Sequence, residues 1–225
     1  MARPLNREKG KTRTLVLHSA TKLFIEKGYT NTRIKDIADD SGVGYNEIFR
    51  MFVDKDNLLS HLVNLVIEHQ FEKSIEYLKE QSEDKLLLYI FECVLQLYIC
   101  EINDNIREMY AVSYSMPSTS HKIYDYITEK LENVFHKYLP EYETKDFYEL
   151  ENAAAGIMRG FIINPCNMYF TIDRKVSRFI KTTLKIYEVP KAKIEEIIKI
   201  IEQFKMQDYA KEVISTLYEY ISMRT

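Results

Sequence analysis

Apolar residues recur every three or four positions through most of the chain, which is the spacing of one buried face of an α-helix. The first such face predicts a helix that ends at Gly28, because glycine readily adopts the left-handed conformation of a helix end. Two short helices follow, at about 32–41 and 45–52. Thr32 is the predicted N-cap of the first, and Asp54 that of a longer fourth helix. The buried faces comprise Leu15, Val16, Ala20, Leu23 and Phe24, then Ile34, Ile37 and Ala38, then Ile48, Phe49 and Phe52.

The same spacing continues to the end of the chain and predicts seven further helices, at about 83–103, 106–114, 121–138, 144–163, 173–187, 191–204 and 208–223. Helix-breaking residues are few, with 5 Pro and 6 Gly among 225 residues. The predicted fold class is therefore all-α. We expect an N-terminal three-helix domain at residues 1–56 and a larger helical bundle at residues 57–225.

The first domain has the pattern of a helix-turn-helix, in which two short helices joined by a glycine-containing turn follow a supporting helix. Ser41-Gly42 ends the first short helix and Val43-Gly44 forms the turn. In this motif the second short helix enters the major groove of DNA and reads base edges with its exposed N-terminal residues. The predicted reading residues are Gly44, Tyr45, Asn46, Glu47 and Arg50.

The chemistry of these residues suits base reading. Arginine pairs with guanine, asparagine with adenine, and glutamate accepts from the cytosine amino group. For Glu47 a solvated or intramolecular carboxylate is an equal alternative, since phosphates repel it. Thr32 and Lys55 lie at helix starts, where backbone N–H groups and the positive dipole end favour phosphate. Arg33, beside Thr32, completes the predicted DNA-binding surface.

The distribution of charge supports a polyanionic partner at one end of the chain. The whole chain carries −3, yet residues 1–56 hold 11 Lys and Arg against 8 Asp and Glu. Within the first 13 residues the ratio is 5 to 1, which makes a basic N-terminal arm. A basic end on an otherwise acidic protein is typical of a segment that meets nucleic acid.

The segment from Leu15 to Leu59 resembles the DNA-binding domain of the TetR family of bacterial regulators. The matching stretches are residues 20–29 (ATKLFIEKGY), 32–38 (TRIKDIA), 42–43 (GV), 48–52 (IFRMF), and 54–55 (DK) through 58–59 (LL). The remaining chain has the length and helical character of that family's variable sensor domain.

The resemblance implies a homodimer that represses nearby genes and releases palindromic operator DNA when a small ligand fills the second domain. It assigns phosphate contacts to Thr32 and Lys55. The chain departs from the family at four positions of the reading segment, where the family often has Ser, Thr, Tyr, and His or Tyr. The residues present there are Gly44, Glu47, Phe49 and Met51.

The second domain is rich in Tyr, Phe and Met, which supply the large apolar surface that a hydrophobic or aromatic effector needs. Several of these residues share helical faces, and a few tyrosine and histidine groups offer polar handles. The alternative for any one of them is plain core packing. The predicted ligand-binding residues are His69, Tyr89, Cys93, Leu97, Tyr110, Tyr114, Met158 and Phe161.

Small residues at 153–156 (AAAG) and Gly160 predict a helix that a partner helix approaches closely, because each glycine inside a helix costs roughly 1 kcal/mol relative to alanine. With the helix that follows, it would make a two-fold four-helix interface. The alternative is a kink beside a ligand cavity. The predicted dimer interface comprises Leu150, Ala154, Ile157, Gly160, Phe161, Val176, Phe179, Ile180 and Leu184.

Other classes of protein find little support in the sequence. The three cysteines have no CxxC spacing and favour reduced core thiols in a cytoplasmic protein, and the charged N-terminus argues against a signal peptide. We expect no membrane partner, no metal site and no cofactor. Enzyme motifs such as GxSxG, GxGxxG, the P-loop and HExxH are absent, so an enzyme is the weaker rival. A regulator without a small ligand, controlled by a protein partner or acting as an activator, remains an alternative, as does a protein–protein module.

Overall fold

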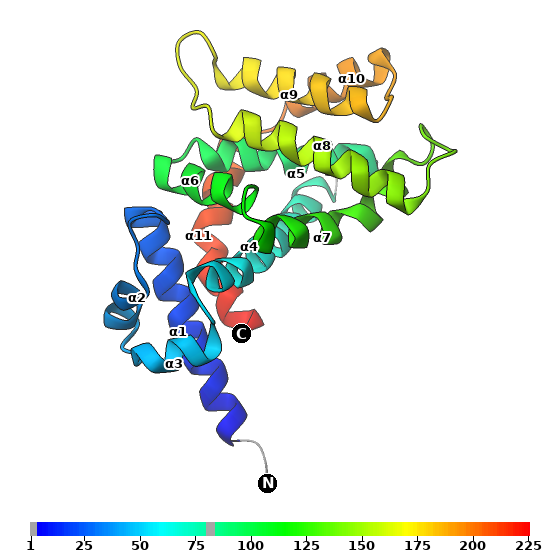
Figure 1. Ribbon diagram of the computed structural model, residues 1–225. Helices are drawn as coiled ribbons and strands as arrows, with labels where there is room; N and C mark the ends of the chain where they lie inside the picture. Colours follow the sequence, from blue (N-terminus) through cyan, green and yellow to red (C-terminus); the bar gives the residue numbers. More distant parts are fainter. Residues whose placement is uncertain (1–3, 80–83) are drawn as a thin grey trace.

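The computed structural model describes residues 4–79 and 84–225, apart from the side chains of residues 4–9, 125 and 129. Over these residues the regular structure is entirely helical, as predicted (Figure 1). The helices are α1 (Pro4–Lys27), α2 (Ile34–Ser41), α3 (Tyr45–Met51), α4 (Lys55–Leu78), α5 (Lys85–Cys100), α6 (Asp104–Ser113), α7 (Pro117–Phe135), α8 (Thr144–Ile162), α9 (Ile172–Ile186), α10 (Lys191–Ile201) and α11 (Met206–Arg224).

The first three helices lie at one end of the molecule, where α2 packs against α1 and α3 packs against α2 (Figure 1). Gly28 and Gly42 both have positive φ, 85° and 69°, and each follows the end of a helix, as predicted for Gly28. A side chain at position 28 would also collide with Glu108 of α6. From Pro4 onward, the basic arm is the first part of α1.

Two N-cap predictions had different outcomes. The Asp54 carboxylate accepts a hydrogen bond from the Asn57 amide at 2.7 Å, so the predicted cap of α4 is confirmed. The prediction of Thr32 as the cap of α2 is wrong, because Arg33 occupies that position. The predicted boundary at residues 56 and 57 falls in the first turn of α4, which continues unbroken into the second domain.

The centre of the body is α5, which α4, α6, α7, α8, α9 and α11 surround. Its sequence is apolar on nearly every face, which is the composition of a helix buried on all sides. The observed bounds of α5–α11 differ from the predicted ones by a few residues at their ends. The predicted start of α5 at residue 83 lies outside the described residues.

The last helix, α11, returns to the middle of the molecule and lies against α1, α4 and α5 (Figure 1, red). On the α1 side, Nε2 of His18 bonds to the Tyr218 carbonyl oxygen at 2.9 Å. On the α4 side, Nε2 of His69 lies 2.9 Å from the Thr216 hydroxyl. The C-terminal helix therefore contacts both domains. Within the described part of the chain, none of the helices is long and apolar enough to cross a membrane.

Candidate functional site

One side of α3 is buried in the domain core, and its other side carries exposed side chains. Ile48 and Phe52 are fully buried and hold the helix against the domain core. Four predicted reading residues, Tyr45, Asn46, Glu47 and Arg50, are exposed. Exposed polar groups on a helix whose opposite face is fixed are the arrangement that base reading in a groove requires.

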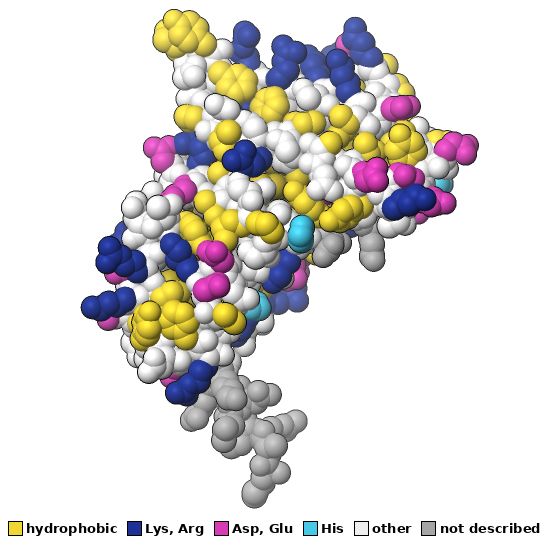
Figure 2. All heavy atoms as spheres, in the orientation of Figure 1, with side chains coloured by type: hydrophobic (Ala, Val, Ile, Leu, Met, Phe, Trp, Pro, Cys, Tyr) yellow, Lys and Arg dark blue, Asp and Glu magenta, His cyan; other side chains and the backbone are white. Residues whose placement is uncertain are grey.

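Phe49 corrects one part of the sequence analysis, since it was expected to be buried and is 37% exposed. Its ring lies 4.8 Å from that of Tyr45 one turn earlier, and Val53 beyond the helix is 73% exposed. Hydrophobic side chains gather on the surface over α2 and α3, with lysine and arginine side chains at the margin (Figure 2). Phe49 turns outward because Ile48 and Phe52 already fill the inner side of this short helix.

Thr32 and Lys55 are engaged inside the domain. The Thr32 side chain is fully buried, and its hydroxyl donates to the Gly28 carbonyl at 2.7 Å. The Lys55 ammonium donates to the carbonyls of Tyr29 and Thr32 at 2.9 and 3.1 Å, and burial lowers its pKa. Both side chains thus stabilise the turn between α1 and α2, and the hydroxyl of Thr32 is not at the surface where a phosphate could reach it.

The remaining groups of this surface are oriented by short hydrogen bonds. The Asp36 carboxylate accepts from the amide of Arg33 at 2.8 Å, and the Arg33 side chain is exposed. Asp40 accepts from Ser19 and from the ammonium of Lys22, at 2.7 and 2.6 Å, which ties α2 to α1. The orientation of α2, and through it that of α3, is therefore fixed relative to α1.

The two domains meet where the end of α1 contacts α6. Asn105 Nδ2 donates to the Ile25 carbonyl at 3.0 Å, and the amide of Thr30 donates to the Glu108 carboxylate at 3.2 Å. Because Asn105 and Glu108 belong to the body, a shift of α6 would move the end of α1. Together with the continuous helix α4, this contact links the body to the DNA-binding surface.

The body contains a cavity of about 340 Å³ between α4, α5 and α7. Its lining is mainly apolar and aromatic, with a small number of charged groups, as is usual for ligand pockets. The lining residues are Ile67, Phe71, Lys85, Leu88, Tyr89, Glu92, Tyr126, Ile127, Lys130, Asn133 and Val134.

Two opposite charges face this apolar space. Glu92 is buried, Gln96 donates to its Oε1 at 2.7 Å, and burial raises the pKa of the carboxyl to about 7. Lys130 places its ammonium 3.7 Å from the centre of the Phe71 ring and 3.4 Å from that of Tyr126. Burial lowers the pKa of Lys130 to about 8, against the opposing effect of the Glu92 charge.

Of the predicted ligand-binding residues, only Tyr89 lines this cavity. Tyr110 and Tyr114 line a separate void of about 30 Å³, which is too small for an effector. The Tyr110 hydroxyl accepts a hydrogen bond from Gln70 of α4, and the Tyr114 hydroxyl donates one to Gln96 of α5. His69 faces α11 instead, as described above. These three predicted residues therefore do not line the cavity.

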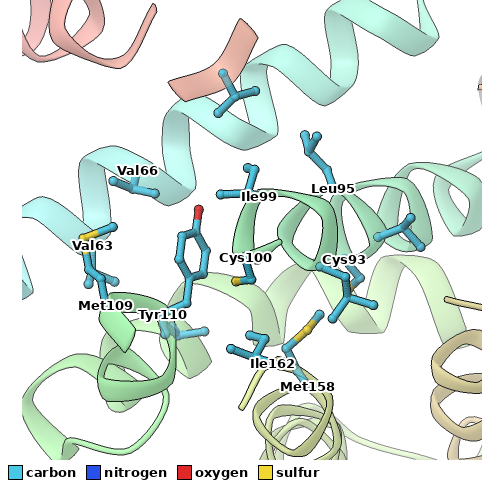
Figure 3. Packing of buried hydrophobic residues seen from close by; sticks show 14 of the residues in the cluster. Val63, Val66, Cys93, Leu95, Ile99, Cys100, Met109, Tyr110, Met158 and Ile162 are labelled. Atoms are coloured by element: carbon cyan, nitrogen blue, oxygen red, sulfur yellow. The ribbon is translucent and has the colours of Figure 1, made fainter. Parts of the chain in front are cut away.

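The other four predicted residues pack elsewhere in the body. Cys93, Leu97 and Met158 are buried in the core, where the side chains of Cys93 and Met158 point toward each other (Figure 3). Phe161 contacts the rings of Phe170 and Phe179 near the end of α8. The alternative reading of plain core packing therefore applies to Cys93, Leu97 and Met158.

The comparisons with known proteins agree with the geometry of the first domain. Residues 16–62 match the family model described as "Bacterial regulatory proteins, tetR family". Two curated relatives, both named HTH-type transcriptional regulators, extend the similarity beyond that segment. The first domain of the chain is thus similar to the DNA-binding domain of TetR-family regulators.

The two relatives are YvkB of Bacillus subtilis (strain 168) and AcrR of Shigella flexneri, each 28% identical to the chain. The match to YvkB covers 52% of this chain and only 59% of that protein, and the match to AcrR covers 72% and 80%. Both are named as transcriptional regulators, which is the class predicted from the sequence. The crystal structure of a gamma-butyrolactone receptor (ArpA like protein) aligns with 92% of this chain at a TM-score of 0.47 and 12% identity.

The TetR resemblance implies a dimer surface on α8 and α9. In the structure some of the predicted residues are exposed or half-buried, and others are buried within the chain. On α8, Gly160 is exposed and nothing stands within 4 Å of the position a Cβ would take, and Gly156 is equally open. Leu150, Ile157 and Phe161 are half-buried, whereas Ala154 is buried. On α9, however, the neighbouring helices already bury all four predicted residues within one chain: Val176, Phe179, Ile180 and Leu184.

Sequence reasoning missed the charged and aromatic lining of the cavity. One signal was present, because Glu92 is the single acidic residue in the apolar sequence of α5. A lone carboxylate in a buried helix requires a partner or a function. No comparable signal marked Phe71, Tyr126 or Lys130, since polar and aromatic residues alternate freely along α4 and α7.

Proposed function

We propose that this chain is a cytoplasmic, dimeric transcription repressor of the TetR family that binds palindromic operator DNA and is released by a small effector. In this proposal α3 enters the major groove, with Asn46 and Arg50 reading bases and Tyr45 and Phe49 contacting apolar groups such as thymine methyls. The observation that carries the proposal is a helix-turn-helix with an exposed reading face, continuous through α4 with a body that holds a cavity.

The cavity supports a small ligand over control by a protein partner alone. A closed core would favour the latter, whereas a mainly apolar space of about 340 Å³ accommodates a small molecule. Its walls include α4, which begins beside the reading helix and carries Ile67 and Phe71. A ligand that favours one arrangement of α4 and α6 would shift the population toward a state with differently spaced reading helices.

The open face of α8 supports the proposed dimer. Gly156 and Gly160 lie one turn apart and leave room for a second helix to approach closely. Replacing Gly160 with Leu should therefore split the dimer and reduce operator affinity, because two half-sites are no longer held together. Analytical ultracentrifugation and operator titration measure the two effects. A Gly160→Leu protein that sediments as a dimer with normal operator affinity would place the dimer contact elsewhere.

Selection of bound sequences from a random duplex pool tests the DNA-binding function directly. The expected result is a palindrome with half-sites roughly one helical turn, or a multiple of it, apart. Affinity for that duplex should fall steeply as salt rises, since phosphate contacts release counterions. Enrichment of no sequence, with equal and weak binding to all duplexes, would contradict the proposal.

A cavity-filling variant tests the effector step. Ile127→Phe should leave operator affinity unchanged, because Ile127 lies on α7, away from the DNA-binding surface. Any compound that lowers operator affinity in the wild type should lose this effect in the variant. Persistence of the full response would place the effector site outside the cavity.

A further inference from the structure

The cavity between α4, α5 and α7 already holds a cation, which is the ammonium of Lys130. It lies against the rings of Phe71 and Tyr126, whose planes meet at 90° with their centres 6.4 Å apart. Ring faces attract cations because of their negative electrostatic potential, most strongly where water is excluded. The two rings therefore form a corner that suits a positive charge.

The same cavity contains a buried carboxyl that has no lysine or arginine bonded to it in the described structure. Glu92 is fixed by Gln96 and influences Lys130 only through its charge, and both residues line the same space. A carboxyl in an apolar cavity is costly to ionise, and its raised pKa reflects that cost. A cation that enters the cavity would favour the ionised form of Glu92, and the negative charge of that carboxylate would in turn stabilise the bound cation.

Lys130 is able to leave this position without unfolding anything. It is half-buried, and its flexible four-carbon side chain can move while the helix stays in place. Glu68, which lines the adjoining surface pocket together with Tyr126 and Lys122, offers a carboxylate outside the cavity. The lowered pKa of Lys130 also indicates that its charged form is poorly solvated where it lies.

An anionic ligand fits the lining less well. The only other lysine, Lys85, is exposed at the edge, and the Lys130 ammonium is directed against the rings. An anion would also approach Glu92, which repels it whenever the carboxyl is ionised. The lining therefore favours a positive ligand over a negative one.

We infer that the cavity binds an organic ammonium cation with an apolar body, and that the Lys130 ammonium is a placeholder that this cation displaces. The ligand cation occupies the corner between Phe71 and Tyr126, beside Glu92, while its apolar body fills the space along Leu88 and Ile127. The inference deepens the proposed function by naming the class of effector, and it rests on that function only for the consequence for DNA binding.

Three probes with the same phenylbutyl body test the charge preference by calorimetry on the full-length protein. They are 4-phenylbutyltrimethylammonium, the neutral 4-phenylbutan-1-ol and the anionic 4-phenylbutanoate. The expected order of affinity is cation, alcohol, anion, with the cation ahead of the alcohol on the order of tenfold. Equal affinity of cation and alcohol, a preference for the anion, or binding of none of the three would overturn the inference.

Two variants test the assigned roles. Lys130→Met should raise the affinity for the cation roughly fivefold, because no resident charge competes for the ring faces. Glu92→Gln should lower that affinity about tenfold while the alcohol binds as before, which also verifies that the cavity has kept its shape. The matched control is Lys137→Met. Lys137 follows the end of α7 and lies over the ring of Tyr138, outside the cavity.

The opposite response is equally informative. If Lys130→Met abolished binding of 4-phenylbutanoate and left the cation unchanged, the cavity would be an anion site. Operator affinity measured with and without the cation separates this inference from the proposed function. Tight cation binding with no change in operator affinity would uphold the site and remove the proposed effector step.

Discussion

The unusual residues of the DNA-binding domain are exposed apolar side chains, whereas those of the body are buried carboxyls. In the first domain, Tyr45, Phe49 and Val53 are apolar or aromatic and exposed, although the core beneath them is well packed. In the body, Glu92 and Glu151 are carboxyls enclosed among apolar side chains. Most proteins bury apolar residues and expose charged ones. The first domain departs from this rule by exposing apolar side chains, and the body departs from it by burying carboxyls.

The difference follows from where each region would meet its partner. DNA approaches from outside, so side chains that contact thymine methyls or sugars have to be exposed at a cost in solubility. A small ligand is enclosed, so the groups that recognise its charge have to be buried at a cost in desolvation. Departures of this kind are expected at functional sites, because elsewhere they bring no compensating gain.

The largest expected effect separates two phenylalanines of the DNA-binding domain, Phe49 and Phe52. Phe52→Ala should lower the free energy of unfolding by about 3–5 kcal/mol, since Phe52 is fully buried and its removal leaves a cavity. Phe49→Ala, three residues earlier, should change stability little and instead weaken operator binding. Urea denaturation and operator titration of both variants measure this contrast. A Phe49→Ala protein as unstable as Phe52→Ala would mean that the exposed ring is part of the core.

The next prediction concerns the buried carboxyls of the body and the dependence of stability on pH. Burial, together with the charge of Glu92, raises the pKa of Glu151 to about 8. A group with a raised pKa in the folded state stabilises the fold fully below its unfolded pKa of about 4.5 and loses that contribution as pH rises toward 8. The unfolding free energy of the wild type should therefore fall between pH 5 and pH 8.

Glu151→Gln should remove part of that slope, because an amide stays neutral throughout. At pH 8 we expect the variant to be more stable than the wild type by on the order of 2 kcal/mol. Glu149→Gln, an exposed carboxyl on the same helix, is the matched control and should leave the slope unchanged. Urea denaturation across this pH range measures both. Identical slopes for Glu151→Gln and the wild type would show that Glu151 is ionised without cost in the folded protein.

The smallest effects distinguish base reading from support of the domain. Arg50→Ala should relax preference at one base pair, at a cost of about 1–3 kcal/mol. Lys55→Ala should weaken all sequences alike and leave the salt dependence unchanged, because its ammonium bonds to the Tyr29 and Thr32 carbonyls. Titration of a panel of operator variants at several salt concentrations measures both. If the salt slope for Lys55→Ala fell by about one, Lys55 would contact a phosphate after all.

The DNA-binding domain was predictable because its signals lie close together along the chain. Gly28, Gly42 and Asp54 mark helix ends through their own backbone or side-chain chemistry, and the buried faces repeat within a few turns. Local sequence therefore determined the number, order and approximate bounds of these helices, and with them the motif. The outward position of Phe49 was not predicted, because apolarity alone does not say which side of a short helix an aromatic ring takes.

The cavity depended on tertiary structure, because its walls come from three helices and its charged groups are far apart in sequence. Phe71, Glu92 and Lys130 belong to α4, α5 and α7, and no local pattern connects them. Packing of α9 against its neighbours likewise decided that Val176 and Phe179 are buried within one chain. The sequence by itself determined the helices, the helix-turn-helix and the resemblance of the first domain to TetR-family regulators. Which faces of those helices meet, and where a space is left between them, depends on the long-range packing of side chains that only the folded chain brings together.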